Sequence, residues 1–181
     1  MNIPNSLTLL RMLLVPAIIW LILSNQMYPA FIVFLLAGVT DALDGFIAKQ
    51  FDMVTPLGTY LDPLADKILL VSIYVTLGIQ ADLPSWLVIL VVSRDFLIVG
   101  GILLTFLLSL NVTILPSKLS KLNTFCQILL AACVLADAGL EIGVGSIVAG
   151  LVYVVALTTI LSGIAYTLQW FRQNGTQTGT K

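Results

Sequence analysis

Apolar segments of about 20 residues follow one another along almost the whole 181-residue chain. A helix needs about 20 predominantly apolar residues to cross the hydrocarbon core of a bilayer. Hydrophobic residues make up 59% of the sequence and charged residues only 9%, which lies outside the range of soluble globular domains. The sequence therefore predicts an all-α integral membrane protein with six transmembrane helices.

A short amphipathic segment, Met1–Ser6, precedes the first predicted span, which ends near Ser24. Turn-forming Asn, Gly and Pro residues divide the rest of the chain. The other five spans are expected at about Pro29–Ala48, Thr59–Gly78, Pro84–Leu108, Lys118–Ala136 and Gly145–Phe171, with a polar link at Lys49–Gly58 and a short loop holding Asp137 and Glu141. We expect one domain over residues 1–172 and a flexible C-terminal tail at 173–181.

Basic residues gather on one side of this six-helix topology. Three of the predicted connections contain neither Lys nor Arg, and all three lie on the same side. The opposite side carries Arg11, Lys49, Lys67, Lys118, Lys121, Arg172 and Lys181. By the positive-inside rule, both termini are predicted to be cytoplasmic.

Four aspartates interrupt the second and third predicted spans. Asp41 and Asp44 are three residues apart and Asp62 and Asp66 are four apart, so each pair shares a helical face. Each such carboxylate opposes insertion by about 2.5 to 3.5 kcal/mol and must be neutralised. The chain has no histidine, which excludes a His-based metal site or a Ser-His-Asp triad. Oxygen ligands alone suit hard ions such as Mg²⁺ or Mn²⁺, and two such ions would balance four carboxylates.

Small residues and one cation accompany the aspartates. Gly45, Ala48 and Gly58 leave room for a bulky ligand near the backbone, and Lys49 adds a positive charge. Metals, small residues and a basic group together suggest a phosphate-bearing ligand. Two alternatives remain open. The aspartates could serve as polar contacts between helices, paired with nearby cations, or they could bind ions in a divalent cation transporter.

The same positions resemble the signature of the CDP-alcohol phosphotransferase family, D-x2-D-G-x2-A-R-x8-G-x3-D-x3-D. The matching residues, with every spacing kept, are Asp41, Asp44, Gly45, Ala48, Lys49, Gly58, Asp62 and Asp66. Lys49 replaces the usual Arg, so the charge is kept but the bidentate phosphate contact is not. The six-helix layout extends the resemblance over nearly the whole chain.

This resemblance implies transfer of a substituted phosphate from a CDP-linked donor to an alcohol, with release of CMP. It implies that Asp41, Asp44 and Asp62 hold two divalent cations, and that Asp66 both binds them and acts as the general base. The CDP pocket would be lined by Gly45, Ala48, Lys49 and Gly58. The resemblance further implies a homodimer. We expect a multi-pass protein among the lipids of the bacterial inner membrane, with no nucleic-acid partner. The distribution of Lys and Arg predicts a cytoplasmic active site.

The alcohol acceptor depends on residues outside the signature. The opening stretch resembles both phosphatidylglycerophosphate synthases and cardiolipin synthases that use CDP-diacylglycerol, whereas the LDPLADKILL, Ser93–Asp95 and Ser120–Thr124 stretches favour the second group. Asn123 stands where the first group more often has a second Lys. That loss of charge suits phosphatidylglycerol, a phosphodiester, better than glycerol 3-phosphate, which carries nearly two charges. We therefore expect phosphatidylglycerol as acceptor and cardiolipin as product, with glycerol 3-phosphate as the alternative.

The residues predicted to bind the acceptor are Arg94, Lys121, Lys118 and Asn123. An Arg inside a span is costly unless it is paired, and either the aspartate cluster or the adjacent Asp95 could supply the counter-charge. Lys118 and Lys121 share a helical face at the predicted cytoplasmic end of the fifth span. Contact with lipid head groups is the alternative role for Lys118.

Overall fold

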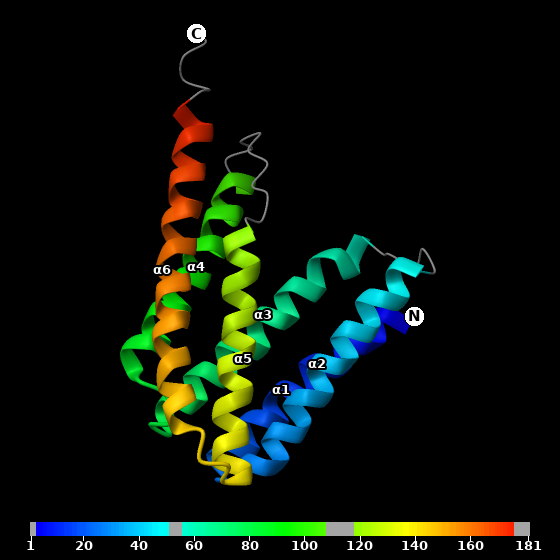
Figure 1. Ribbon diagram of the computed structural model, residues 1–181. Coiled ribbons are helices and arrows are strands. Elements are labelled where there is room, and N and C mark those ends of the chain that lie inside the picture. The colour runs from blue at the N-terminus through cyan, green and yellow to red at the C-terminus, as the bar shows by residue number, and fades with distance from the viewer. Residues whose placement is uncertain (1–2, 51–55, 108–117, 176–181) are drawn as a thin grey trace. The chain divides into compact units, whose positions relative to one another are not determined.

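Most of the residues that the computed structural model describes are helical. The described residues are 3–50, 56–107 and 118–175 for the backbone, and 9–41, 65–101 and 118–169 for the side chains. Within these ranges there are six α-helices and no strand (Figure 1). They are α1 (Ile3–Leu23), α2 (Met27–Gln50), α3 (Pro56–Ile79), α4 (Ser85–Leu107), α5 (Lys118–Leu140) and α6 (Gly145–Gly175). The predicted all-α class with six helices is confirmed.

The helix ends differ from the predicted ones at the polar connections. Lys49 and Gly58, placed in a link by the sequence, both have helical backbone, because α2 continues to Gln50 and α3 begins at Pro56. A proline at the first helical position suits a helix start, since its missing N–H needs no partner there. Residues 51–55 lie outside the described part of the chain, as do 176–181 of the predicted tail.

The outer surface of the helices is apolar. Lys118–Leu140 and Gly145–Gln169 are long and apolar enough to cross a membrane, and Leu9–Leu23 and Met27–Asp41 are shorter apolar stretches in the described part of the chain. Large side chains project outward along α4 and α6, including Ile89, Phe96 and Tyr153, whose exposed fractions are 65%, 70% and 70%. Such a surface agrees with a protein of the membrane, where these side chains contact lipid.

The chain divides into two compact units. The first comprises residues 1–85 and 131–145, and therefore α1, α2, α3 and the end of α5. The second comprises residues 86–130 and 146–181, with α4, the first part of α5 and α6. Ile18 and Leu77 are fully buried in the first unit, and Leu87 and Val155 in the second. A single domain over residues 1–172 stays a prediction.

Two helices of the first unit end in the same kind of tight turn. Asn25 and Ala81 adopt the left-handed conformation with φ of 56° and 65°. The next N–H in each case reaches back to the last turn, from Gln26 to the Leu21 carbonyl at 2.9 Å and from Asp82 to the Leu77 carbonyl at 3.0 Å. This is the Schellman pattern, which satisfies carbonyls left over at a helix end.

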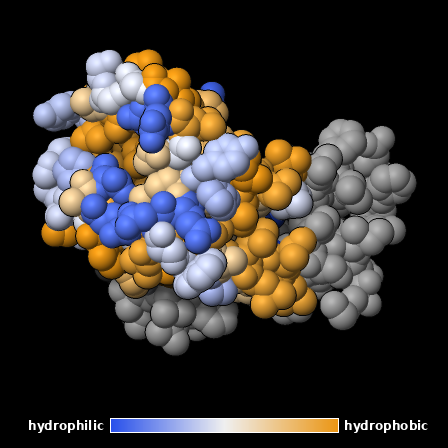
Figure 2. Space-filling model, turned by 90° about the horizontal axis from the view of Figure 1, so that it is seen from below, coloured by the Kyte–Doolittle hydropathy of each residue, from blue (hydrophilic) through white to orange (hydrophobic). Residues whose placement is uncertain are grey.

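Side-chain contacts tie the turns of the first unit together. Gln80 donates a hydrogen bond from Nε2 to the Ile22 carbonyl at 2.9 Å, which joins the end of α3 to the end of α1. Asp137, predicted in a loop, lies in the last turn of α5, and its Oδ1 accepts a 2.8 Å hydrogen bond from the Val144 amide. Figure 2 views the molecule from the end that carries these turns and shows hydrophilic residues gathered among hydrophobic ones.

Candidate active site

One guanidinium joins the second and third helices of the first unit. Arg11, on α1, lies with Nη2 2.5 Å from Asp41 Oδ1 on α2 and with Nη1 2.6 Å from Asp66 Oδ1 on α3. The Arg11 side chain is only 1% exposed, whereas those of Asp41 and Asp66 are 45% and 42% exposed. The cation is therefore enclosed, and the two carboxylates remain accessible on their outer side.

The three residues meet because each lies at a similar level in its helix. The rise of an α-helix is 1.5 Å per residue, which places Arg11, Asp41 and Asp66 about 18 to 21 Å from the ends of their helices at the α1–α2 and α3–α4 turns. Those turns are held side by side through Gln80 and Ile22. Helix lengths and turn contacts thus bring to one place two aspartates that are 25 positions apart in the sequence.

The other predicted site residues of this region lie outside the described side chains. Asp44, Gly45, Ala48 and Lys49 belong to α2, and Gly58 and Asp62 to α3, by their backbone alone. Among the side chains that the structure describes, no group of three acidic, thiol or imidazole ligands converges. The four-aspartate cluster and its two cations stay a prediction.

The two described aspartates fit a site for hard cations. Asp41 and Asp66 come from different helices, converge on one guanidinium, and both keep side-chain surface exposed. Carboxylate oxygens are the ligands that Mg²⁺ and Mn²⁺ prefer. The helical backbone also places Asp44 one turn after Asp41 and Asp62 one turn before Asp66, so each pair shares a helical face.

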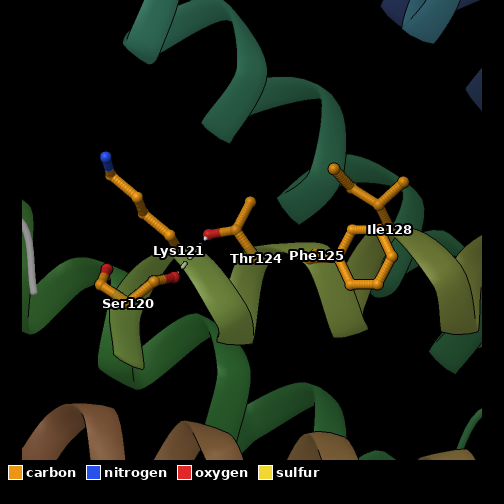
Figure 3. A pocket seen from close by; sticks show the side chains of 5 residues that line it. All are labelled: Ser120, Lys121, Thr124, Phe125 and Ile128. Carbon is orange, nitrogen blue, oxygen red and sulfur yellow. Dashed lines mark hydrogen bonds between the residues drawn. The ribbon is translucent and has the colours of Figure 1, made fainter. Parts of the chain in front are cut away.

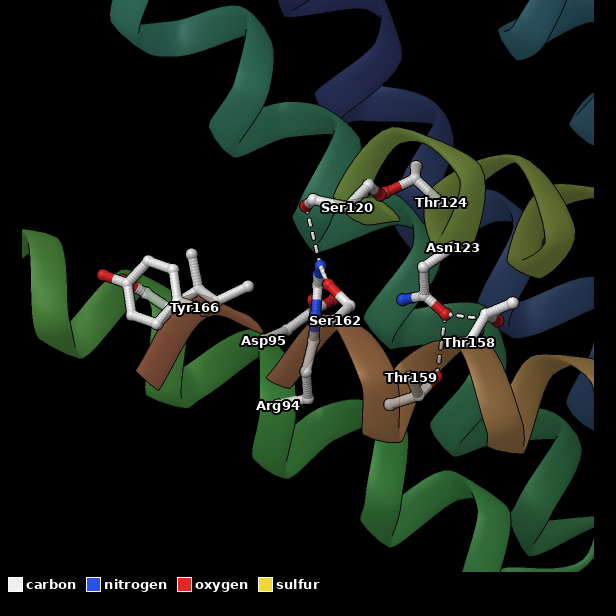
Figure 4. Close-up of polar contacts among 10 residues, drawn as sticks. Arg94, Asp95, Ser120, Asn123, Thr124, Thr158, Thr159, Ser162 and Tyr166 are labelled. Carbon is white, nitrogen blue, oxygen red and sulfur yellow. Dashed lines mark hydrogen bonds and ion pairs between the residues drawn. The ribbon is translucent and has the colours of Figure 1, made fainter. Parts of the chain in front are cut away.

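The second unit contains a buried polar cluster built around Arg94 (Figure 4). Arg94 Nη1 donates to Asp95 Oδ1 at 2.7 Å, and Nη2 donates to the hydroxyls of Ser120 on α5 and Ser162 on α6, at 2.7 and 2.5 Å. Both members of the Arg94–Asp95 pair are buried. Asp95 is therefore a direct counter-charge of Arg94, and the same guanidinium links all three helices of this unit.

Asn123 occupies the next turn of α5 and is fully buried. Its Oδ1 accepts hydrogen bonds from the hydroxyls of Thr158 and Thr159, each at 2.9 Å. Figure 4 shows its amide nitrogen pointing toward Arg94. Among the described residues, neither this Nδ2 nor the Nε of Arg94 has a hydrogen-bond partner. Two buried donors in one cluster thus lack an acceptor.

An open groove of about 410 Å³ runs along α5. Its lining residues are Ser120, Lys121, Thr124, Phe125 and Ile128. Figure 3 shows that the polar members lie toward the start of the helix and the apolar members farther along it. The groove therefore offers a cation and hydroxyls at one end and an apolar track at the other. Lys118, also predicted to bind the acceptor, is exposed one turn before the groove.

Several residues of these two sites have roles that sequence reasoning missed. The sequence places Arg11 among the cytoplasmic-side cations and in the opening stretch that carries the family resemblance, but no partner is predicted for it. A cation inside a span demands a counter-charge, and on that ground Arg11 could have been paired with the aspartates. Thr158, Thr159 and Ser162 gave no separate signal. Their roles depend on how α6 is rotated against α5, which their spacing alone does not fix.

Comparison with known sequences links most of the chain to one group of enzymes. Residues 1–168 match the family described as CDP-alcohol phosphatidyltransferase. A CDP-diacylglycerol--glycerol-3-phosphate 3-phosphatidyltransferase of Rickettsia typhi is 34% identical over 170 residues, which cover 91% of this chain and 94% of that protein.

Other relatives carry a different name. A cardiolipin synthase (CMP-forming) / mitochondrial hydrolase fusion protein of Schizosaccharomyces pombe is 33% identical over 180 residues, covering 91% of this chain but 30% of the fusion protein. A cardiolipin synthase (CMP-forming) of Rattus norvegicus is 34% identical over 151 residues, covering 75% of this chain and 50% of the rat protein. The relatives therefore include two kinds of phosphatidyltransferase at nearly equal identity.

Proposed function

The chain belongs to the CDP-alcohol phosphatidyltransferase family, and we propose that it transfers the phosphatidyl group of CDP-diacylglycerol to phosphatidylglycerol, giving cardiolipin and CMP. That it is an enzyme, a phosphatidyltransferase with a CDP-alcohol donor, follows from the family match and from the relatives named for this activity. The family match also sets aside the cation transporter considered from the sequence.

The proposal places the donor on the first unit. Asp41, Asp44, Asp62 and Asp66 would hold two divalent cations, Mg²⁺ or Mn²⁺. When bound, these ions would draw charge from the pyrophosphate and stabilise the departing CMP. The convergence of Asp41 and Asp66 at Arg11 supports this assignment, because it places one aspartate of α2 and one of α3 on the same side chain of α1. The CDP moiety would lie against Gly45, Ala48, Lys49 and Gly58.

Asp66 is the proposed general base of the reaction. Its carboxylate is bound to Arg11 on one oxygen and is 42% exposed, so an acceptor hydroxyl can approach it. A carboxylate next to cations is a weak base. Its contribution is therefore to hold the acceptor hydroxyl in line for attack and to receive its proton as the new phosphodiester bond forms.

The observation that carries the choice of acceptor is the groove along α5. Lys121 and the Ser120 hydroxyl match a phosphodiester head group, and Phe125 and Ile128 continue as a surface for an acyl chain. The Thr124 hydroxyl already donates to the Ser120 carbonyl at 3.1 Å. Phosphatidylglycerol has both parts. Glycerol 3-phosphate is small and polar throughout, and the apolar half of the groove would have nothing to bind.

The buried cluster of the second unit supports the same acceptor. Asn123 is neutral, and its Oδ1 accepts hydrogen bonds from two threonine hydroxyls. A lysine at this position, as expected for an enzyme that binds glycerol 3-phosphate, would add a positive charge. Arg94 and Asn123 are buried, so they would act on the acceptor through the position of α5 and not by direct contact with the phosphodiester. Arg94 also fixes Ser120 at the head of the groove. A role for Lys118 at the same end completes the proposed acceptor site.

Glycerol 3-phosphate is the second candidate acceptor. It is favoured by the Rickettsia typhi relative, whose alignment covers most of both proteins. We further propose that the protein is a multi-pass homodimer of the bacterial inner membrane, with both termini and the active site on the cytoplasmic side. The distribution of Lys and Arg supports that orientation.

The acceptor is tested with the purified full-length chain in lipid nanodiscs containing CDP-diacylglycerol and Mn²⁺. Phosphatidylglycerol and glycerol 3-phosphate are supplied in separate reactions, and CMP and the lipid product are measured. Cardiolipin formed with phosphatidylglycerol is the expected product. Phosphatidylglycerophosphate formed from glycerol 3-phosphate, with no cardiolipin in the parallel reaction, would establish the second candidate.

The groove is tested with two variants in the same assay. Lys121→Gln should raise the KM for phosphatidylglycerol by about tenfold, as expected for loss of a charge-assisted contact of about 1.4 kcal/mol, and leave the KM for CDP-diacylglycerol unchanged. Phe125→Ser should reduce turnover of long-chain phosphatidylglycerol more than that of a short-chain analogue. An equal effect on both chain lengths would mean that the apolar track does not hold the acyl chain.

A further inference from the structure

Arg11 contacts two aspartates of the predicted metal cluster from inside the protein. It is one of the largest fully buried side chains of the described residues. Both of its terminal nitrogens are directed at carboxylates, each at Oδ1, with distances of 2.5 Å to Asp41 and 2.6 Å to Asp66. One side chain of α1 therefore sets the position of an oxygen on α2 and of an oxygen on α3.

The three side chains differ in their exposure to the outside of the protein. Arg11 is 1% exposed, whereas the two carboxylates that it contacts are 45% and 42% exposed. An ion arriving from outside meets the carboxylates first and need not displace the guanidinium. Replacing a side chain that holds a metal ligand in its orientation typically lowers metal affinity by about 10- to 100-fold.

We propose that Arg11 is a positioning residue that orients Asp41 and Asp66 toward a divalent cation, an inference that rests on the proposed function. The planar guanidinium can address two carboxylates at once through separate nitrogens, which a single ammonium group cannot do with the same geometry. Its charge also lowers the repulsion between the two carboxylates while α2 and α3 are held together.

Two other roles make different predictions for metal binding. If Arg11 only fastened three helices together, its loss would lower thermal stability and leave the affinity of the folded protein for cations unchanged. If Arg11 competed with cations for the carboxylates, its removal would strengthen cation binding, because a positive charge would leave the site. Only positioning predicts weaker binding in a protein that is still folded.

The test measures Mn²⁺ binding to the full-length protein without substrate, by the electron paramagnetic resonance signal of free Mn²⁺. The variants are Arg11→Gln, which removes charge and geometry, and Arg11→Lys, which keeps the charge. Lys181→Gln is the control, since it removes one positive charge at the last residue of the chain. Circular dichroism and thermal unfolding in EDTA report whether each variant is folded.

Positioning predicts that Arg11→Gln raises the Kd for Mn²⁺ by about 10- to 100-fold and that Arg11→Lys raises it by a smaller factor, still above threefold. The control should bind as the wild type does. Unchanged or tighter binding by a folded Arg11 variant would overturn the proposal. If Arg11→Gln does not fold, Arg11→Lys decides alone by the same criterion. Absence of Mn²⁺ binding by the wild-type protein would instead refute the metal site of the proposed function.

Discussion

The pair formed by Arg94 and Asp95 allows a quantitative test of the second unit. Replacing Arg94 with Met keeps the length of the side chain and removes its charge. The Asp95 carboxylate, which is 4% exposed, then loses the guanidinium at 2.7 Å, and the hydroxyls of Ser120 and Ser162 lose their donor. Removing one partner of a buried ion pair costs about 3 to 5 kcal/mol. We expect a loss near the upper limit, because charge-assisted hydrogen bonds to two hydroxyls disappear as well.

The double variant Arg94→Met/Asp95→Leu is the matched control. Replacing both members of a buried pair with apolar residues is often neutral or stabilising, because no unpaired charge remains. Most of the lost stability should therefore return. Thermal unfolding in detergent, followed through the fluorescence of Trp20 and Trp86, measures both variants. For a chain of this length the single variant should lower Tm by about 6 to 20 °C.

The same two proteins separate stability from acceptor binding. The KM for phosphatidylglycerol should be raised in both, since Ser120 loses the hydrogen bond that holds it at the head of the groove. A single variant that lowers Tm by less than about 2 °C would refute the reasoning, because the carboxylate of Asp95 would then not depend on Arg94. A double variant as unstable as the single one would refute it equally.

Two further predictions concern the first unit. Gly139→Ala should destabilise the protein by about 1 to 3 kcal/mol, because the new Cβ would lie 2.7 Å from the backbone N and Cα of Tyr28. Gly150→Ala is the control: its Cβ would meet nothing within 4 Å, so the change should be neutral or slightly stabilising. Thermal unfolding of the two variants compares them, and equal effects would contradict the packing of α5 against the start of α2. Asp66→Asn should keep donor binding and lose turnover, since the amide can still accept from Arg11 but cannot receive a proton. Titration with CDP-diacylglycerol and measurement of CMP release check both parts, and loss of Mn²⁺ binding instead would make Asp66 chiefly a ligand.

The helices could be predicted from the sequence because membrane spans require long apolar runs. The predicted helix ends lie within a few residues of the observed ones for most helices. They differ where a polar residue was predicted to lie in a loop. Lys49 continues α2, and Asp137 remains in α5. For Asp137 the reason is visible, because its carboxylate accepts a hydrogen bond from the Val144 amide and the residue can therefore stay in the helix at the end of the span.

The candidate sites could be predicted only in part. The spacing within Asp41/Asp44 and within Asp62/Asp66 predicts one acidic face on each of two helices, and one aspartate from each pair, Asp41 and Asp66, meets at Arg11. The partner that joins them, Arg11, lies 30 residues before Asp41. Likewise, the threonines that fix Asn123 lie on another helix. Helical periodicity gives the face of one helix, but pairing between helices depends on their rotation and relative height, which follow from the complete packing.

The outward side chains of α4 and α6 bear on which interactions hold the helices of this protein together. In water, Phe96 and Tyr153, each 70% exposed, would be driven together with other apolar surfaces. Lipid tails solvate such side chains as well as a protein interior does, so this force does not hold the helices to one another in a bilayer. Association then rests on close packing and on polar contacts in the interior. The protein is in this respect the reverse of a soluble helical bundle, and a substitution in its buried arginine, serine or threonine residues should cost more than the loss of a large outer hydrocarbon side chain.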